Sequence, residues 1–339
     1  MNIKQTLRTL TEQIGVSGNE GAASALAAEL LKEYCTDIET DAFGNVTGMI
    51  RCGKDGAKTL MLDAHIDQIG MIVTYIDNGG FLKVGACGGL DMRTMLAQSV
   101  TVHGSEPLQG VVCTLPPHVS TDHSKVPEIG EIAIDIGMTK EQAERLVSLG
   151  DRVTVNSCFR ELSGLVSAPS VDDRAGVCVI LRALELLRTR KLNYDIAVCF
   201  SAQEETGERG VKQAAFRLAP EEAIIVDVSF GRTPDSASHE TAEMGSGAMI
   251  GVSAVLDRGM TERLKALAKQ HDIPYTIEVM PSSTGTNADA VSVSRSGVRC
   301  CTVSVPIRYM HTPVEAVNVS DIEAAARLIC EYAGGESSV

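Results

Sequence analysis

The chain of 339 residues contains no tryptophan and only six phenylalanines and six tyrosines. So few rings leave little material for the aromatic platforms on which sugars and nucleic-acid bases stack. No apolar run approaches the ~20 residues that a membrane-spanning helix needs, and the N-terminal segment lacks the apolar stretch and small-residue cleavage site of a secretion signal. We therefore expect a soluble cytoplasmic protein without a membrane partner.

Positive charge is also scarce, because 30 lysines and arginines stand against 44 aspartates and glutamates, for a formal net charge of −14. Such a chain repels a phosphate backbone, and its basic residues form no stripe, so nucleic acid is not an expected partner. The ten cysteines include no Cys-x-x-Cys pair for zinc binding or redox chemistry. We expect most of them to be buried as small apolar side chains.

Hydrophobic periodicity divides the chain into two regions of different texture. The first region has helical spacing within residues 4–36, strand-like runs at 45–51 and 59–63, and then alternating helices and strands after residue 162. These include helices near 174–190, 261–271 and 320–332, and strands at 195–201, 223–226 and 298–305. The second region, 69–161, contains only short β-type segments. The pattern predicts an α/β domain, residues 1–68 and 162–339, interrupted by an inserted β-rich domain, residues 69–161.

Polar residues follow the expected strands of the α/β region. Ligands of an open α/β sheet bind beyond the carboxyl ends of its strands, so we expect these residues to converge. Each one alone is also typical of a helix N-cap, a structural histidine or a solvated acidic loop. Their repetition at five strand ends favours a functional site. The residues are His65 and Asp67, Asp172, Glu204 and Glu205, Asp227, and His311.

Imidazole and carboxylate groups together suit zinc, cobalt or manganese, and a pair of such ions needs one carboxylate whose two oxygens can bridge them. We interpret Asp172 as this bridge. His65 and Asp227 would complete one metal site, and His311 and Glu205 would complete the other. Paired ions of this kind lower the pKa of water toward neutrality, which points to hydrolysis.

Two further carboxylates are expected to act without binding metal. Glu204, next to Glu205 on an irregular loop, can reach the attacking water as a general base. Asp67, two residues after His65, can accept the free imidazole N–H, although a turn residue is equally typical of this position. We expect surface or structural roles for the remaining histidines, which are His103, His118, His123, His239 and His271.

These residues stand in ordered motifs that resemble the dinuclear metallo-aminopeptidases of the glutamyl-aminopeptidase, TET and FrvX-like type, whose members are often labelled endoglucanase. The motifs span essentially the whole chain and are Gly15–Glu20, Asp41–Asn45, Asp63–Gly70, Asp172–Arg174, Glu204–Gly210 and Pro306–His311. The resemblance implies the same five metal ligands and the same base. A family loop reading Gly-Thr-Asp-Ala resembles the segment Ser283–Ala290, where Asn287 interrupts the spacing and leaves a substrate role for Asp289 open.

The resemblance also implies a fold and an assembly. It implies a phosphorylase/hydrolase-like α/β catalytic domain with a mixed central sheet, interrupted by a PDZ-like β-barrel that mediates dimer contacts. Dimers would assemble into tetrahedral twelve-subunit particles. The implied cofactors are two divalent metal ions per subunit, zinc or cobalt, and the implied substrates are short peptides that lose their N-terminal residue.

Three other functions are compatible with parts of this pattern. A deacylase would use the same metal site but would not require a free α-amine on its substrate. A glycoside hydrolase also uses two carboxylates, but the absence of tryptophan argues against an extended glucan cleft. A non-catalytic ion-binding scaffold has no need of a free base such as Glu204 beside its ligands.

Overall fold

The computed structural model describes residues 1–115, 119 and 125–337. Its centre is an eleven-stranded mixed sheet in which the strands follow the order β1-β2-β13-β3-β14-β17-β18-β11-β10, while β15 and β16 extend from β17. The strands of this sheet are β1 Thr36–Thr40, β2 Val46–Ile50, β3 Thr59–His65, β10 Arg160–Glu161, β11 Val166–Ala168, β13 Asp195–Ser201, β14 Glu222–Phe230, β15 Ala248–Ser253, β16 Tyr275–Met280, β17 Arg299–Arg308 and β18 Glu315–Val317.

The middle of the sheet is a run of parallel strands, β13-β3-β14-β17. These strands are covered on both faces, so their sequences are continuous apolar runs rather than alternating ones, as in Ile196–Phe200 of β13, which is fully buried. The mixed sheet confirms the predicted α/β class. A small second sheet pairs β12, Arg190–Leu192, with β19, Gly334–Ser337.

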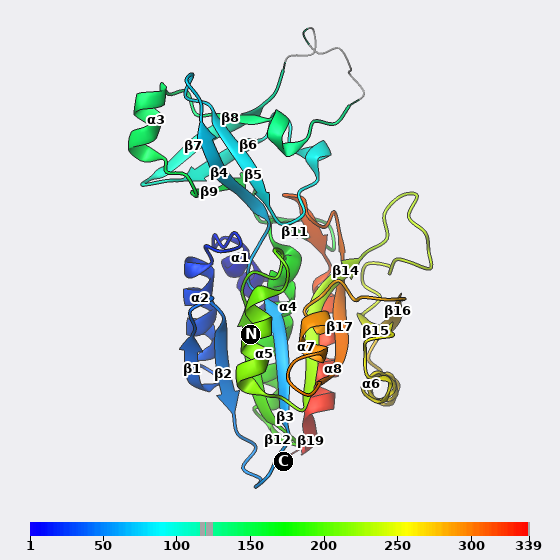
Figure 1. Ribbon diagram of the computed structural model, residues 1–339. Helices are drawn as coiled ribbons and strands as arrows, with labels where there is room; N and C mark the ends of the chain where they lie inside the picture. Colours follow the sequence, from blue (N-terminus) through cyan, green and yellow to red (C-terminus); the bar gives the residue numbers. More distant parts are fainter. Residues whose placement is uncertain (116–118, 120–124, 338–339) are drawn as a thin grey trace.

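Helices cover both faces of the large sheet (Figure 1). One apolar core contains buried side chains of α1, α2, α4, α6 and α8, and a second core on the other face contains those of α5 and α7. The apolar side chains of Val177, Ile180 and Leu184 on α4 are buried in the first core. The helices are α1 Ile3–Thr11, α2 Gly21–Leu31, α3 Lys140–Leu146, α4 Val171–Leu187, α5 Arg209–Leu218, α6 Arg258–Gln270, α7 Ala288–Ser292 and α8 Val319–Ala333.

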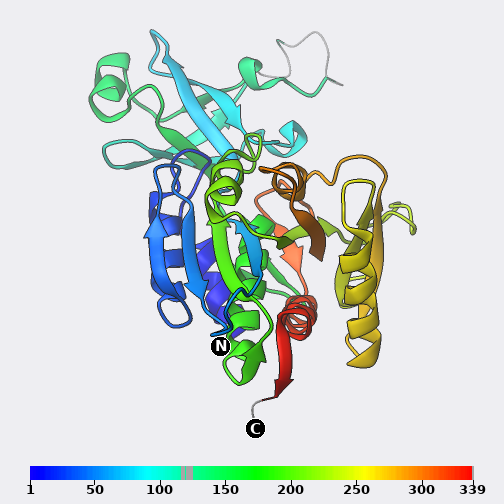
Figure 2. The same cartoon turned by 60° about the horizontal axis from the view of Figure 1, so that its bottom comes forward.

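The region between β3 and β10 forms a closed six-stranded barrel with its own apolar core. Figures 1 and 2 show it at one end of the sheet, beyond the end of β3. A β-rich segment is therefore present here, whereas its PDZ-like character and the division into domains stay predictions. Its strands, in the order β4-β5-β8-β7-β6-β9, are β4 Gly70–Ile76, β5 Leu82–Cys87, β8 Ala133–Asp135, β7 Pro107–Cys113, β6 Ser99–His103 and β9 Arg152–Val155.

The expected end of one strand was wrong. The sequence places Asp227 after a strand that ends at Val226, but β14 continues to Phe230. The pairing of β14 with β3 stops at Ile225, while its pairing with β17 continues to Phe230. Asp227 therefore lies inside a strand whose β3 side is open beyond Ile225, which allows a carboxylate there. Elements that the sequence did not predict include β1, β10, β12, β15, β16, β18, β19, α3, α5 and α7.

Two expectations about composition can be compared with the structure. All ten cysteines are free, and seven of them are buried, which confirms their expected role as small apolar side chains. None of the described helices combines the length and the apolar character needed to cross a bilayer. The cytoplasmic location stays a prediction.

Candidate metal centre

The five predicted metal ligands come together around the carboxylate of Asp172. Its Oδ1 lies 3.0 Å from Nε2 of His65, and its Oδ2 lies 3.4 Å from Nε2 of His311. The other two carboxylates stand beside one imidazole each, with Glu205 Oε2 3.5 Å from His311 Nε2 and Asp227 Oδ1 3.9 Å from His65 Nε2. One carboxylate thus stands between two histidines, each with a further carboxylate of its own.

Neighbouring strands of the sheet bring these residues to one edge. His65 ends β3 and is the register partner of Ser201, the last residue of β13. The backbone N–H of Ile66 donates to the carbonyl of Ser201 at 2.7 Å. The strands β3 and β13 therefore end side by side, at the same position along the sheet. The loop after β13 carries Glu204 and Glu205. Helix α4 begins at Val171 and carries Asp172 in its first turn, with non-helical backbone angles.

Asp67 connects the histidine side of the cluster to this loop. Its carboxylate accepts the backbone N–H groups of Glu204 at 2.9 Å and Glu205 at 3.2 Å, and the hydroxyl of Ser17 at 2.5 Å. His65 Nδ1 lies 3.2 Å from the carbonyl of Asp67 and 3.5 Å from its carboxylate. The hydrogen bonds outweigh burial and lower the pKa of Asp67. The backbone carbonyl of Asp67 is therefore the closer acceptor for the imidazole, while its carboxylate holds the loop.

Burial has the largest effect on the pKa values of the carboxylates in the cluster, because few positive charges lie near them. Burial opposes ionisation of Asp172, but hydrogen bonds with His311 and His65 outweigh it and lower its pKa. Asp227 and Glu205 have fewer favourable partners, so burial and the charge of Asp172 raise their pKa values well above the usual range. Divalent cations would remove this penalty, and imidazole with carboxylate is a suitable donor set for zinc or cobalt. The residues present fit such ions.

Glu204 has the environment of a proton carrier. Burial raises the pKa of Glu204 to about 7, with His65 opposing and Asp67 adding to the shift. A general base works best when its pKa lies near the working pH, which is satisfied here near neutrality. Its side chain lines the same pocket as the five candidate ligands.

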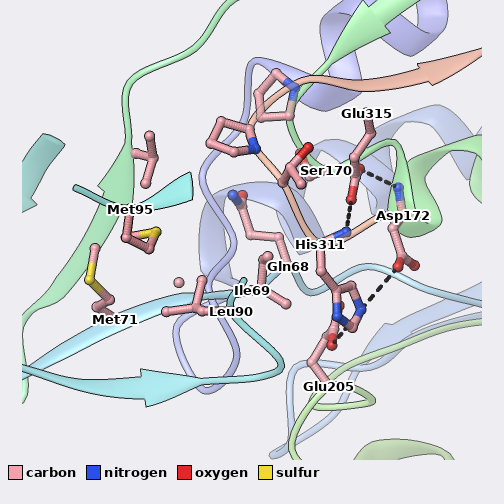
Figure 3. Close-up of a pocket in the computed structure, with 15 residues that line it drawn as sticks. Gln68, Ile69, Met71, Leu90, Met95, Ser170, Asp172, Glu205, His311 and Glu315 are labelled. Atoms are coloured by element: carbon pink, nitrogen blue, oxygen red, sulfur yellow. Dashed lines mark hydrogen bonds and ion pairs between the residues drawn. The ribbon is translucent and has the colours of Figure 1, made fainter. Parts of the chain in front are cut away.

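Two pockets open from the cluster. The first, which we call the acidic pocket, has a cavity volume of about 460 Å³ and contains six carboxylate side chains. Its lining residues are His65, Gly89, Asp172, Glu204, Glu205, Glu208, Asp227, Val228, Ser229, Phe230, Glu278, Thr284, Gly285, Thr286, Ser304, Met310 and His311. The apolar pocket has a volume of about 40 Å³, and Figure 3 shows barrel residues such as Met71, Leu90 and Met95 across from Asp172 and His311. The two pockets share Asp172, Glu205 and His311.

Comparison with known proteins identifies the group to which this chain belongs. The model of the M42 glutamyl aminopeptidase family matches residues 44–328. The chain belongs to the M42 family. The lysyl aminopeptidase of Pyrococcus furiosus is 31% identical to it over 334 residues, covering 96% of this chain and 94% of the relative.

Solved structures agree with this membership. An aminopeptidase from the archaeon Desulfurococcus kamchatkensis matches with a TM-score of 0.92 and 32% identity, covering 99% of this chain and 95% of the other. The TET1 peptidase of Pyrococcus horikoshii, which can assemble into a tetrahedron or a large octahedral shell, matches with a TM-score of 0.87 and 28% identity over 99% and 100% of the two chains. The predicted resemblance is confirmed, and the M42 family supports a metal-dependent aminopeptidase.

Sequence reasoning about this M42 peptidase missed two buried carboxylates at the cluster. Glu315 accepts the backbone N–H of Asp172 at 3.0 Å and that of His311 at 2.9 Å, so one side chain holds both segments (Figure 3). Asp173 offers a donor atom within 4.8 Å of those of His65 and Asp227, and its buried Oδ2 has no hydrogen-bond partner. The only sequence signals for these two residues were that Asp173 directly follows Asp172 and that Glu315 follows His311 by four residues.

The open question about the segment Ser283–Ala290 has a structural answer. The carboxylate of Asp289 accepts the backbone N–H groups of Thr284 and Gly285, so it shapes the loop that borders the acidic pocket. Asn287 donates to Asp63 at 2.7 Å and to Ser201 at 2.8 Å, which anchors the same loop to the ends of β3 and β13. Neither residue lines the pocket.

The histidines outside the motifs lie away from the cluster where they are described. His103 contacts Thr154 in the barrel, His239 stands beside Glu240, and His271 stands beside Glu331. His118 and His123 lie outside the described residues.

Proposed function

We propose that this chain removes the N-terminal residue from short peptides, using two divalent ions and Glu204 as general base. The observation that carries the proposal is the single carboxylate of Asp172 between the imidazoles of His65 and His311, at 3.0 and 3.4 Å. Beside it stands the half-buried Glu204, which is not among the ligands. His65, Asp172 and Asp227 would hold one ion. Asp172, Glu205 and His311 would hold the other.

When bound, two such ions supply Lewis-acid chemistry that polarises a peptide carbonyl and lowers the pKa of water. The protein's own groups transfer the proton and hold the base in position. Glu204 accepts a proton from the attacking water and then passes it to the nitrogen of the leaving amine, which makes it base and then acid. Asp67 holds the backbone of Glu204 in place through a 2.9 Å hydrogen bond. Asp67 is thus a positioning residue.

The test begins by chelating the protein and incubating it with a pool of short peptides, half of them N-acetylated. Zinc or cobalt is then restored, and the products are followed by mass spectrometry. We expect metal-dependent loss of single residues from free N-termini only. Equal cleavage of acetylated peptides would favour the deacylase alternative instead. No cleavage would favour the scaffold.

We also propose that the chain forms a homo-oligomer in which the barrel contributes a PDZ-like dimer contact and dimers build a dodecamer. Support comes from the TET1 structure, which matches 99% of this chain and assembles into a tetrahedron or an octahedral shell. Native mass spectrometry will distinguish a dimer from a twelve-subunit particle. A monomer at micromolar concentration would contradict the proposal.

A further inference from the structure

Glu278 lies in the acidic pocket although it belongs to none of the sequence motifs. It stands on β16, which pairs with β15, and β15 pairs with β17 (Figure 1). Its carboxylate accepts hydrogen bonds from the hydroxyls of Ser229 and Ser304, the latter at 3.1 Å. Ser229 follows Asp227 by two residues on β14 and therefore points to the same face. Ser304 is the register partner of Asp227 on β17, so Glu278 lies beside the candidate metal ligand.

This carboxylate has no basic partner in the described part of the chain. Its two hydrogen bonds come from neutral hydroxyls, and the lining of the acidic pocket includes no lysine or arginine. Burial raises the pKa of Glu278, because an ionised carboxylate loses hydration there. A cation delivered from outside would compensate for this loss. Glu278 thus has the surroundings of a group that receives a positively charged ligand.

The pocket also has the size and the walls for a long side chain with a cationic end. Its volume of about 460 Å³ compares with about 40 Å³ for the apolar pocket. Val228, Phe230 and Met310 contribute apolar wall to it. Lysine and arginine side chains combine an apolar stem, which can pack against such walls, with a charged head that a carboxylate can bind.

The first residue of a peptide is the one that always carries a positive charge, on its α-amine. Outside the proposed ligands and base, the acidic pocket holds two further carboxylates, Glu208 and Glu278. In the apolar pocket, the one carboxylate outside the proposed ligands is Glu315, and it already accepts two backbone N–H groups. The larger, acidic pocket is therefore the one that accommodates the first residue.

We propose that Glu278 gives this enzyme a preference for peptides whose first residue is lysine or arginine, by binding the charged end of that side chain. This inference rests on the proposed aminopeptidase function. It names the substrate class of the same site and assigns the selection to one residue on β16, which is not a ligand of the ions.

The test compares tripeptides Xaa-Ala-Ala in which Xaa is lysine, arginine, norleucine or leucine, with the metal-loaded full chain. Norleucine has the aliphatic stem of lysine without its charge. We expect kcat/KM for lysine to exceed that for norleucine by roughly 30-fold or more, which is the usual consequence of removing one partner from a buried charge pair. In Glu278→Gln, the ratio should fall to within about threefold through loss of lysine cleavage. Retained norleucine cleavage shows that the variant is folded.

A matched variant, Glu208→Gln, removes the other uncommitted carboxylate of the same pocket and should leave the lysine-to-norleucine ratio above tenfold. The specificity inference is overturned if Glu278→Gln leaves the ratio unchanged or if Glu208→Gln alone abolishes it. It is also overturned if Glu278→Gln lowers cleavage of all four peptides equally, because Glu278 would then bind the α-amine. Failure to cleave any of the four peptides would instead contradict the proposed function.

Discussion

The large sheet and the barrel are both built from β-strands, yet all seven residues predicted for the site belong to the sheet and its connections. The parallel strands β3, β13, β14 and β17 run in one direction, so residues at or beyond their carboxyl ends meet at one edge. The barrel strands are antiparallel and close on themselves, and their inward side chains fill their own core. The barrel contributes apolar wall instead, with Met71, Leu90 and Met95 in the apolar pocket.

This difference teaches that the chemical groups and the apolar wall of the smaller pocket come from separate parts of the fold. Carboxylates and imidazoles need fixed positions, which aligned strand ends provide through their shared register. A wall that contacts a substrate side chain needs only shape and apolar surface, which the barrel supplies. Substitutions in the two regions should therefore differ in kind as well as in size.

The largest expected effect comes from Glu204→Gln. The amide cannot accept a proton, so kcat should fall by roughly 100- to 10,000-fold. The same chemical change in the barrel, Glu144→Gln on the exposed side of α3, should leave kcat within about twofold of the wild type. Both variants are assayed for turnover and for metal content by elemental analysis. More than a tenth of the wild-type activity in Glu204→Gln would remove Glu204 from the role of base.

The next effect concerns Glu315, which accepts the backbone N–H groups of Asp172 and His311. In Glu315→Gln, the amide NH₂ must face one of these two donors, so one segment loses its acceptor. We expect metal affinity to weaken by roughly 10- to 100-fold, as for other groups that orient metal ligands. Metal titration by calorimetry measures the change. Unchanged affinity in a variant with unchanged circular dichroism would show that Glu315 does not position the site.

A smaller effect is expected from the barrel wall. Leu90→Ala removes apolar surface from the apolar pocket, which by its position across the cluster should contact the second residue of a peptide. We expect KM to rise up to about tenfold for peptides with a large apolar second residue, while kcat changes little. The control is Leu149→Ala, since Leu149 is an exposed barrel residue outside the pocket. A large fall in kcat for Leu90→Ala would mean that the barrel takes part in the chemistry.

The smallest expected effect is a difference in how the stability contributions of Asp321, in the sheet region, and His103, in the barrel, depend on pH. Burial raises the pKa of Asp321 on α8 to about 6, so the native state favours its protonated form. The contribution of Asp321 to stability should therefore decrease as pH rises from about 4 to about 6. In the barrel, burial lowers the pKa of His103, although Asp151 opposes this shift. The contribution of His103 is complete above about pH 6.5 and should be lost as pH falls.

Urea unfolding of the wild type, Asp321→Asn and His103→Gln between pH 4 and 8 will check these opposite trends. The free-energy difference between His103→Gln and the wild type should shift in favour of the variant toward the acidic end of this range. The difference for Asp321→Asn should shift in favour of the variant between about pH 4 and pH 6. Parallel curves for all three proteins would contradict both assignments.

The candidate ligands could be located from the sequence because their signals are local. His65 and Asp67 follow an apolar run, and Glu204 and Glu205 follow another, so the strand-end rule applied without knowledge of the fold. The same rule selected Asp227, which lies 3.9 Å from His65 in the structure, but wrongly placed it after its strand. The length of β14 depends on its pairing with β17, and residues 222–230 alone do not specify this pairing.

Glu278 and Glu315 could not have been found in this way. Glu315 accepts from Asp172, 143 residues away, and Glu278 accepts from Ser229, 49 residues away. No periodicity marks either glutamate as different from the others in the chain. Glu278 lies on β16, and neither β16 nor its partner β15 was predicted. β16 pairs with β15 and β15 pairs with β17, so the place of both strands depends on pairing between distant segments rather than on a strong local pattern.

The sequence by itself determined the class of the fold, the family and the residues that gather at the sheet edge, since periodicity and short motifs express local physical preferences. Only the tertiary structure decided which imidazole faces which oxygen of Asp172, which buried carboxylates are left without a cation, and that the barrel and the sheet close around the apolar pocket. Those features depend on the distances between segments far apart in the chain. Packing of the complete core sets these distances, and no local pattern records them.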